Sequence, residues 1–249
     1  MTVNDSGQVA LVTGGGTGIG RETALQLAEA GWRVIVTGRR HAPLADLASG
    51  HPAIDHRVAD VADPARVASL VDEVADIHGR LDALINNAGV LVPLPATNPE
   101  PEALRQLFSI NVFGPSYLVG AAVKHLSVSG GSVVNVSSAV AQRPSSRAGF
   151  YGASKAALDY LTRSWAAELA AHGIRVNGVA PGPTETPIMS TVLPAEKIAE
   201  VTAKEAASLP LKRRGTADEV ARWIVALADP ASSWVTGQVI AVDGGMVIA

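Results

Sequence analysis

Tyr151 and Lys155 are the residues of this sequence best suited to proton transfer. They open a run with helical spacing, so their separation of four residues places the tyrosine hydroxyl and the lysine ammonium one turn apart on one helix face. A nearby cation stabilises the phenolate, and lowering the pKa of a tyrosine from about 10 to near neutrality takes roughly 4 kcal/mol. The pair could therefore act as an acid/base, although the same spacing alone is more common on a solvated helix face.

A glycine-rich turn, Thr13 to Arg21, follows a strand-like run and precedes a helical run from Glu22 to Ala30. Glycines there let the backbone approach a pyrophosphate, and the N–H groups and dipole of the helix supply positive charge. The pattern is G-x3-G-x-G rather than G-x-G-x-x-G, and a Walker A loop would need Lys and Ser/Thr where Arg21 and Glu22 stand. The turn therefore predicts a dinucleotide site, with a merely glycine-rich turn as the alternative.

Further polar residues follow strand-like runs or interrupt a helix. Ser138 comes directly after an apolar run, and in open α/β sheets ligands bind at the carboxyl ends of strands, where a hydroxyl could donate to a substrate carbonyl oxygen. The run Asn86 to Gly89 follows another strand-like run. Asn111 lies inside the helical stretch Leu104 to Val119, where Asn is a poor helix former. The alternative for Ser138 and for Asn86 to Gly89 is an ordinary turn.

Short β-branched apolar runs alternate with longer segments of helical period along the whole chain. This alternation is typical of βαβ units around a parallel sheet, and consecutive apolar positions indicate strands buried on both faces. The predicted strands are Val9–Thr13, Arg33–Thr37, Ala53–Val58, Leu81–Ile85, Ser132–Val136, Arg175–Val179 and Gln238–Val242. We therefore predict an α/β, Rossmann-like, doubly wound domain with about seven parallel strands and helices on both faces.

No linker, charge block or repeat divides the chain, so residues 1–249 are predicted to form a single domain. The main irregular stretch is Pro181 to Pro210, which carries five prolines and is predicted to be a loop or small lid over the substrate.

Composition excludes several classes of protein. The 249 residues are 47% hydrophobic with a formal net charge of -3, which excludes intrinsic disorder, and without basic runs a nucleic-acid or anionic-membrane partner is not expected. The absence of cysteine excludes disulfides and thiolate sites. No apolar stretch is long enough to span a bilayer, and Met1–Ser6 does not begin a signal peptide, so we expect a cytoplasmic protein.

Taken together, these motifs resemble the classical short-chain dehydrogenase/reductase family over nearly the whole chain. Its glycine signature T-G-x3-G-x-G and its N-N-A-G segment are both present, and its Y-x3-K spacing is intact. The resemblance implies four catalytic residues, which are Asn111, Ser138, Tyr151 and Lys155. It also implies binding of a nicotinamide dinucleotide by residues of the glycine turn, the strand ends and the segment after Pro181. The predicted cofactor-binding residues are Gly14, Gly16, Thr17, Gly18, Ile19, Gly20, Arg39, Asp60, Val61, Asn87, Ala88, Gly89, Tyr151, Lys155, Pro181, Gly182, Thr184 and Thr186.

The function implied is hydride transfer between a nicotinamide cofactor and a carbonyl or secondary alcohol. In the reduction, Tyr151 would protonate the carbonyl oxygen, Ser138 would steady it, Lys155 would lower the tyrosine pKa and bind the ribose, and Asn111 would hold a relay water. A catalytically idle dinucleotide-binding sensor is the alternative, but it would be expected to lose Tyr151 or Lys155. A serine hydrolase lacks the closing glycine of its elbow, because Ala156 stands there. No histidine spacing predicts a metal site.

Cofactor choice rests on the end of the second strand. NAD-selective sites place Asp or Glu there for the ribose 2′-hydroxyl, whereas Arg accommodates the 2′-phosphate of NADP. Here Gly38 and Arg39 replace the acid, so NADP(H) is favoured and NAD(H) remains possible.

A homo-oligomer, most simply a tetramer, is implied by the resemblance. Phe108, Val112, Trp165 and Trp223 also exceed what one core stripe per helix needs. The sequence names neither the substrate, nor the direction of the reaction, nor its stereochemistry.

Overall fold

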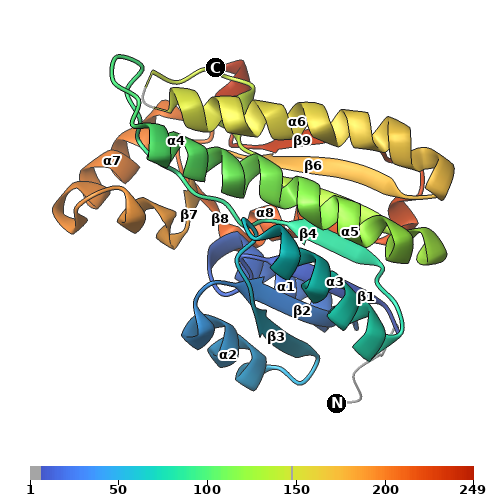
Figure 1. Cartoon of the computed structure of the whole chain (residues 1–249). Helices are drawn as coiled ribbons and strands as arrows, with labels where there is room; N and C mark the ends of the chain where they lie inside the picture. Colours follow the sequence, from blue (N-terminus) through green and yellow to red (C-terminus); the bar gives the residue numbers. More distant parts are fainter. Residues whose placement is uncertain (1–6, 147) are drawn as a thin grey trace.

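Seven parallel strands form one sheet in the order β3-β2-β1-β4-β5-β6-β9 (Figure 1). The structure, a computed structural model, describes residues 7–146 and 148–249. The strands are β1 (Val9–Thr13), β2 (Arg33–Gly38), β3 (Ile54–Val58), β4 (Ala83–Asn86), β5 (Ser132–Val136), β6 (Arg175–Pro181) and β9 (Val239–Val242). The predicted fold class is confirmed, and two of the predicted strands have the bounds observed. Four of the other five differ by one or two residues at one end, and β4 differs at both ends.

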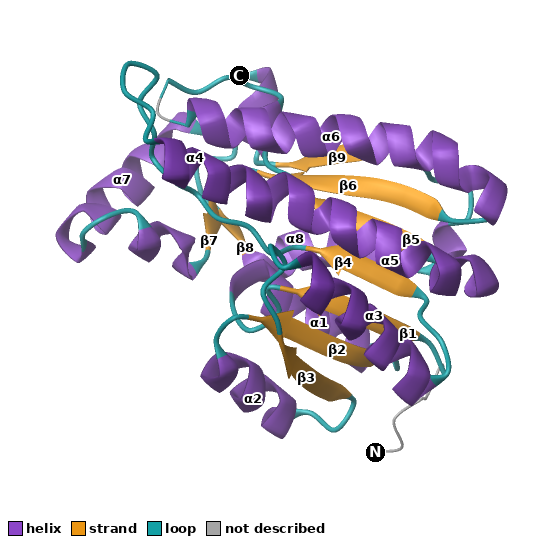
Figure 2. Cartoon of the chain, in the orientation of Figure 1, coloured by secondary structure: helices purple, strands orange, loops and turns teal. Residues whose placement is uncertain are grey.

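Helices cover both faces of this sheet (Figure 2). One face carries α1, α2 and α8, and the other carries α3, α5 and α6. The helices are α1 (Gly18–Glu29), α2 (His41–Gly50), α3 (Pro64–His78), α4 (Pro101–Phe108), α5 (Gly114–Ser129), α6 (Gly149–Leu169), α7 (Ala195–Ser208) and α8 (Ala217–Ala228).

Alternate residues of each central strand serve two separate cores. In β1, Val9 and Leu11 pack under α3 and α5, whereas Ala10 and Val12 pack under α1 and α8. Successive strand side chains point to opposite faces, so a run that is apolar at every position can fill both layers. This explains why the strands of the sequence read as continuous apolar runs.

The stretch predicted to be one helix around Asn111 is divided. A π-helical turn, Ser109–Phe113, separates α4 from α5. Such turns interrupt the regular hydrogen-bond ladder and are frequent at functional sites. Asn111, a poor helix former, therefore lies where the regular α-helix is interrupted.

The expectation of an irregular loop over residues 181–210 is wrong in its secondary structure. The segment holds the end of β6, the short strand β7 (Thr184–Glu185), a 3-10 turn (Pro187–Thr191) and the 14-residue helix α7. Its prolines stand at the boundaries of these elements, where a missing N–H is tolerated, rather than inside a loop. Strand β7 pairs in parallel with β8 (Gly215–Thr216).

Of the four apolar side chains expected to lack a place in the core, only Trp223 is largely exposed, at 48%. Val112 is buried, and Phe108 and Trp165 are half-buried. Other aromatic side chains are exposed instead. They are Phe113 in the π-helical turn, Tyr117 on α5, Tyr160 on α6 and Trp234 after α8.

The helical run Pro101–Ser129 is long and apolar enough to cross a bilayer by length and composition alone. Half of its most apolar window is buried inside the fold, and core helices of soluble proteins pass the same test, so this is a weak indication. The expectation about Met1–Ser6 lies outside the described residues.

Candidate active site

The predicted site residues gather at the carboxyl edge of the sheet, around β1 and β4. From β1 the chain order runs outward to β2 and β3 on one side, and from β4 to β5, β6 and β9 on the other. Neighbouring crossovers therefore leave in opposite directions between β1 and β4, which creates a crevice at the strand ends. The glycine turn leaves β1 at this point, and Asn87 leaves β4 beside it.

The glycine turn is packed so closely that side chains would not fit. Gly14 and Gly18 have φ values of +63° and +56°, in the region that favours glycine. A Cβ at Gly14 would lie 2.9 Å from Nδ2 of Asn87 and 3.0 Å from Cα of Ala88, and one at Gly20 would collide with the same Asn87 amide. These positions therefore keep the backbone N–H groups at the start of α1 open to a ligand.

Asn87 is the clamp that shapes this turn. Its Nδ2 donates to the carbonyl oxygens of Thr13, at 2.8 Å, and Gly14, at 3.2 Å. The Thr13 hydroxyl accepts from the backbone N–H of Asn87 and of Ala88, both at 3.0 Å, and donates to the carbonyl of Ile85. Sequence reasoning treated Asn87 as a ligand contact and gave Thr13 no role, whereas the structure shows both joining β1 to β4.

Lys155 is buried, with 4% of its surface exposed, and its Nζ donates to the carbonyl of Val136 at 2.8 Å. Gly89 lies against this ammonium and the Asn111 side chain, because a Cβ on Gly89 would be 3.3 Å from Nζ and 3.4 Å from Oδ1. Tyr151, one turn before Lys155 on α6, accepts a hydrogen bond from the Ser138 hydroxyl. The four residues predicted to be catalytic thus come together from α6, the end of β5 and the π-helical turn.

Asn111 is fully buried and fixed by its side chain. Its Oδ1 accepts from the N–H of Val90 at 2.9 Å, and its Nδ2 donates to the Val90 carbonyl at 3.0 Å and to the Ser154 hydroxyl at 3.1 Å. The side chain therefore joins the turn before α5 to the segment after β4 and to α6. The relay role of Asn111 implied by the resemblance stays a prediction.

The electrostatics differ from the expectation that Lys155 lowers the pKa of Tyr151. Burial raises the pKa of Tyr151, and only the hydrogen bond from Ser138 opposes this. Burial also lowers the pKa of Lys155 to about 8, against an opposing effect of Asp159. Burial disfavours the charged form of either group, and the lysine ammonium is directed at the Val136 carbonyl. Burial therefore favours the neutral phenol of Tyr151 over the phenolate.

Asp159 is a residue that sequence reasoning missed. It lies one turn beyond Lys155 on α6 and is 5% exposed. Burial raises its pKa, while a hydrogen bond from Ser137 and the charges of Arg163 and Lys155 lower it. The signal was available in the sequence, because positions 151, 155 and 159 share the four-residue spacing of one helix face.

The remaining cofactor positions surround the same edge. Thr186 lies against Gly18, where a Cβ would be 3.2 Å from the threonine Cβ, and Thr184 donates to the Gly182 carbonyl at 2.9 Å. Gly182 is packed on the backbone of Asp243. The segment after Pro181 therefore reaches the glycine turn, as the resemblance implies.

Positions at the ends of β2 and β3 have different surroundings. Arg39 is exposed, and Oδ1 of Asp60 accepts from the N–H of Ala62 at 3.0 Å. The Val61 side chain is buried and packs on Gly114, so it supports α5 rather than facing a ligand. Ile19 packs partly against the core beneath α1, and Gly16 faces Pro43 and Leu44 of α2.

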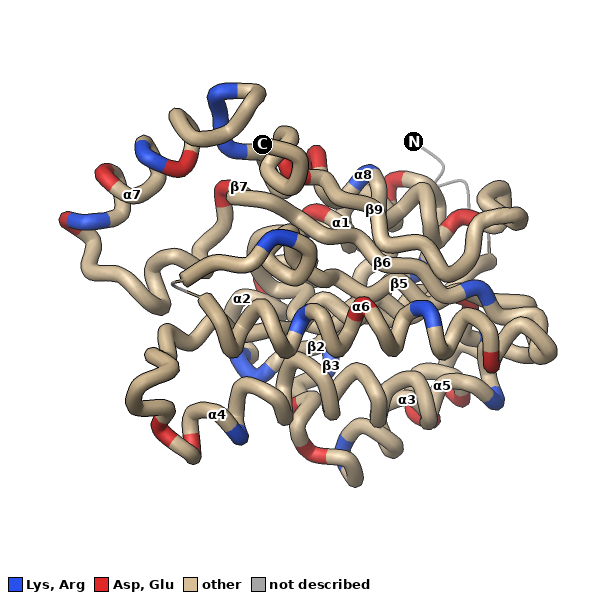
Figure 3. Tube along the Cα trace, turned by 90° about the horizontal axis from the view of Figure 1, so that it is seen from above, with Lys and Arg blue, Asp and Glu red and all other residues tan. Residues whose placement is uncertain are grey.

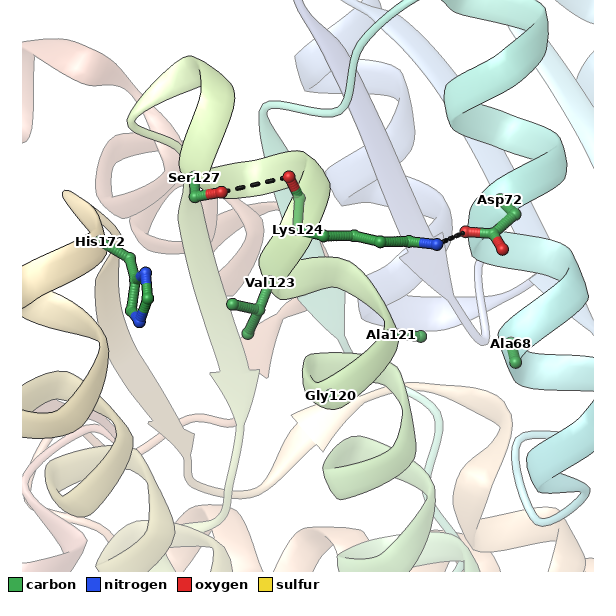
Figure 4. A pocket seen from close by; sticks show the side chains of 8 residues that line it. All are labelled: Ala68, Asp72, Gly120, Ala121, Val123, Lys124, Ser127 and His172. Atoms are coloured by element: carbon green, nitrogen blue, oxygen red, sulfur yellow. Dashed lines mark hydrogen bonds and ion pairs between the residues drawn. The ribbon is translucent and has the colours of Figure 1, made fainter.

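A cavity of about 510 Å³ lies elsewhere, between α3, α5 and the end of α6 (Figure 4). Lys124 and Asp72 form an ion pair across it at 2.7 Å, and His172 lies on its far side. These residues are near the amino ends of the strands, away from the edge that holds Tyr151. In residues 7–146 and 148–249, no group of three or more His, Cys, Asp or Glu side chains could hold a metal ion.

Comparison with known proteins agrees with this geometry. A family model described as enoyl-(acyl carrier protein) reductase matches residues 14–247. The chain is 38% identical to 3-oxoacyl-[acyl-carrier-protein] reductase FabG of Thermotoga maritima over 248 residues, which cover 97% of this chain and 98% of the relative.

The chain belongs to the classical short-chain dehydrogenase/reductase family. It is therefore an oxidoreductase of the class that acts on carbonyl and alcohol groups. The chain is also 40% identical to cis-4-hydroxycyclohexanecarboxylate dehydrogenase of Sinomonas cyclohexanicum over 244 residues, which cover 96% of each chain. The structure of a 3-ketoacyl-(acyl-carrier-protein) reductase from Brucella melitensis, complexed with NADH, superposes with a TM-score of 0.91 at 31% identity, covering 97% of this chain and 99% of that one. An actinorhodin polyketide ketoreductase with NADPH gives the same TM-score at 30% identity, covering 97% and 98%.

Proposed function

We propose that this short-chain dehydrogenase/reductase transfers a hydride between NADP(H) and a ketone or secondary alcohol, with Tyr151 as the acid/base. The observation that carries the proposal is the hydrogen bond from Ser138 to Tyr151, one helical turn from the buried Lys155. A phenol that holds its proton at neutral pH suits the protonation of a carbonyl oxygen. The two relatives described above are named as a reductase and a dehydrogenase, so both directions of one chemistry occur among similar chains.

The residues present fit a nicotinamide dinucleotide. The pyrophosphate would lie on the glycine turn, where a Cβ at Gly14 or Gly20 would collide with Asn87. Lys155 would hold the ribose, and Thr184 and Thr186 would contact the nicotinamide end beside Gly18. When bound, the cofactor supplies or accepts the hydride.

Each catalytic side chain then has one task. Tyr151 gives its proton to the substrate oxygen in the reduction, and Ser138 donates a hydrogen bond to the same oxygen as negative charge develops on it. Lys155 holds the ribose through its ammonium, and Asn111 keeps Val90 and α6 in register around the site. In the oxidation the roles of donor and acceptor at Tyr151 are exchanged.

NADP(H) is proposed over NAD(H) because Arg39, at the exposed end of β2, stands where an acid would bind the ribose of NAD. One of the similar structures contains NADH and another NADPH, so they do not decide the choice.

Residues 1–249 are proposed to act as one domain in the cytoplasm, with residues 181–210 covering the substrate. A homotetramer is proposed because Phe113, Tyr117 and Tyr160 expose aromatic rings on neighbouring helices. Light scattering at micromolar concentration tests this, and a monomer would contradict it.

A panel of ketones and secondary alcohols, followed by nicotinamide absorbance with NADPH and NADH, tests the function. With the best substrate, Tyr151→Phe should lower turnover by about 100-fold or more while cofactor affinity survives, because the variant loses one hydroxyl and keeps the ring. Tyr160→Phe is the matched control, since that tyrosine is exposed on the same helix. Turnover that survives Tyr151→Phe would overturn the mechanism. Cofactor binding without turnover of any substrate would favour the idle sensor.

A further inference from the structure

Arg214 is a buried cation at the base of helix α7, outside the catalytic group described above. Its side chain is 10% exposed, and its Nη2 donates to the carbonyl of Thr184 at 2.6 Å. Its Nε lies 3.2 Å from Oε2 of Glu205, in the last turn of α7. One guanidinium thus links α7 to β7 while its own backbone belongs to the segment that leads into β8.

Helix α7 has few other attachments. None of its 14 residues, all of which the structure describes, is fully buried, and its charges of both signs are spread along it (Figure 3). Figure 1 shows the helix beyond the carboxyl ends of the strands. Its last turn is held by Leu209, which is buried directly after it, and by Lys212, whose Nζ donates to the Ala207 carbonyl at 3.0 Å. The direction of the whole helix is therefore set from its C-terminal end.

The ion pair between Glu205 and Arg214 is suited to fixing the orientation of helix α7. Burial raises the pKa of Glu205, and the charge of Arg214 opposes that rise. The Arg214 side chain is 10% exposed and that of Glu205 29%, so removing the Glu205 charge would leave a largely buried cation uncompensated. The guanidinium donates in a fixed direction from Nη2 to the Thr184 carbonyl, whereas its Nε and Oε2 of Glu205 make no hydrogen bond and are paired by charge alone.

The same guanidinium also contacts the segment that is proposed to bind the cofactor. Thr184, whose carbonyl it holds, precedes Thr186 by two residues, and Thr186 lies against Gly18 of the glycine turn. A displacement of Arg214 would therefore shift both α7 and β7, the strand that precedes Thr186.

We propose that Arg214 is a positioning residue, paired with Glu205, which holds helix α7 at a fixed angle over the substrate and keeps it in register with the Thr184–Thr186 segment. This inference rests on the proposed function, because it takes residues 181–210 to cover the substrate. Arg214 touches neither substrate nor reacting atoms. It acts through the helix that it orients.

The adjacent residue provides a matched control. Arg213 also forms an ion pair, with Glu219 at 2.6 Å, but its side chain is 55% exposed. Arg213 donates to both carboxylate oxygens of Glu219 on α8, and this bidentate pair does not involve α7. Arg213→Met and Arg214→Met therefore remove the same side chain from neighbouring positions, and only the second breaks the buried link.

Steady-state kinetics on the best carbonyl substrate, with cofactor saturating, is the first measurement. Arg214→Met should raise the substrate KM by about tenfold or more, because small misplacements far from the chemistry are costly, while kcat changes less. Glu205→Gln, which has nearly the same shape and leaves Arg214 bound to Thr184, should raise the KM in the same direction. Arg214→Lys should recover part of the loss, and Arg213→Met should match the wild type.

Native-state proteolysis is the second measurement and needs no turnover. Trypsin should cut after Lys197 and Lys204 of α7 faster in Arg214→Met and Glu205→Gln than in Arg213→Met, and mass spectrometry identifies the sites. Equal cleavage of α7 in all three variants would overturn the inference, as would an unchanged substrate KM in a folded Glu205→Gln protein. A wild type that turns over no carbonyl would defeat the proposed function instead, and the cleavage rates would still decide the role of Arg214.

Discussion

The glycine turn and helix α7 flank the same edge of the sheet but are held in different ways. The turn is fixed from all sides, by positive φ at Gly14 and Gly18, by the Asn87 amide and by β1, which is buried at every position. Helix α7 has no fully buried residue and is attached mainly at its last turn. The glycine turn therefore tolerates almost no substitution, whereas the side chains on the inner face of α7 can vary.

This difference between the two regions explains how chains with nearly the same fold can be named for different substrates. The two relatives and the two structures described above share 30 to 40% of their residues with this chain, and the two structures superpose on it with a TM-score of 0.91. A pyrophosphate group needs one fixed binding turn, whereas different substrates need different side chains around them. Residues 181–210 are therefore where we expect the substrate to be chosen, and the experiments below test the contrast between the two regions.

The largest expected effect is at Gly14. Gly14→Ala places a methyl group 2.9 Å from the Asn87 amide at a φ of +63°, so cofactor affinity should fall by about 100-fold and the melting temperature should drop. Gly120→Ala is the control, because it lies on α5 with nothing within 4 Å and should be neutral or slightly stabilising. Calorimetric titration and thermal unfolding measure both. Equal affinity in the two variants would show that the turn tolerates change as α7 does.

The second effect is a pH dependence on the fixed side of the site. Burial lowers the pKa of Lys155 to about 8, so its ammonium is present below that pH and is lost as the pH rises through it. Cofactor affinity should therefore weaken by about tenfold between pH 7 and pH 9, since a charge-assisted contact is lost. Asp159→Asn removes a carboxylate that raises the lysine pKa, so the midpoint should move to lower pH. A midpoint that stays in place or rises in this variant would contradict the assignment.

The third effect is on cofactor selectivity. Arg39→Ala should lower the preference for NADPH over NADH by several-fold, since an exposed guanidinium that contacts a phosphate contributes modestly in water. Arg40→Ala, which removes the neighbouring exposed arginine, is the control. The ratio of kcat/KM for the two cofactors is the measurement. A wild type that uses NADH equally well or better would refute the choice of NADP(H).

The smallest effect separates the two regions by stability. Val71→Ala, in the core under α3, should cost about 2 kcal/mol of unfolding free energy, whereas Val201→Ala on the half-buried face of α7 should cost less than about 1 kcal/mol. The second substitution should instead change the relative rates on substrates of different size. Denaturant unfolding and a substrate series measure the two quantities. A large stability loss at Val201 would mean that α7 belongs to the core after all.

Most of the fold could be predicted from local pattern. The strands were recoverable to within two residues because apolar runs such as Val9–Thr13 and Ser132–Val136 are short, β-branched and bounded by turn residues. Helix α7 was missed because its prolines indicate irregular structure, although Pro194 and Pro210 only bound the helix. Local propensity does not say whether a proline interrupts an element or delimits it.

The sequence by itself determined the residue types at the site, their order along the chain and the spacing of Tyr151 and Lys155, because these depend on neighbours within one helical turn. Only the tertiary structure decided that Asn87 clamps the glycine turn, that burial raises the tyrosine pKa and that Arg214 joins α7 to β7. Partners such as Asn87 and Thr13 are 74 residues apart. Such contacts, and the degree of burial that shifts a pKa, arise only when the crossovers bring distant strand ends to one edge of the sheet.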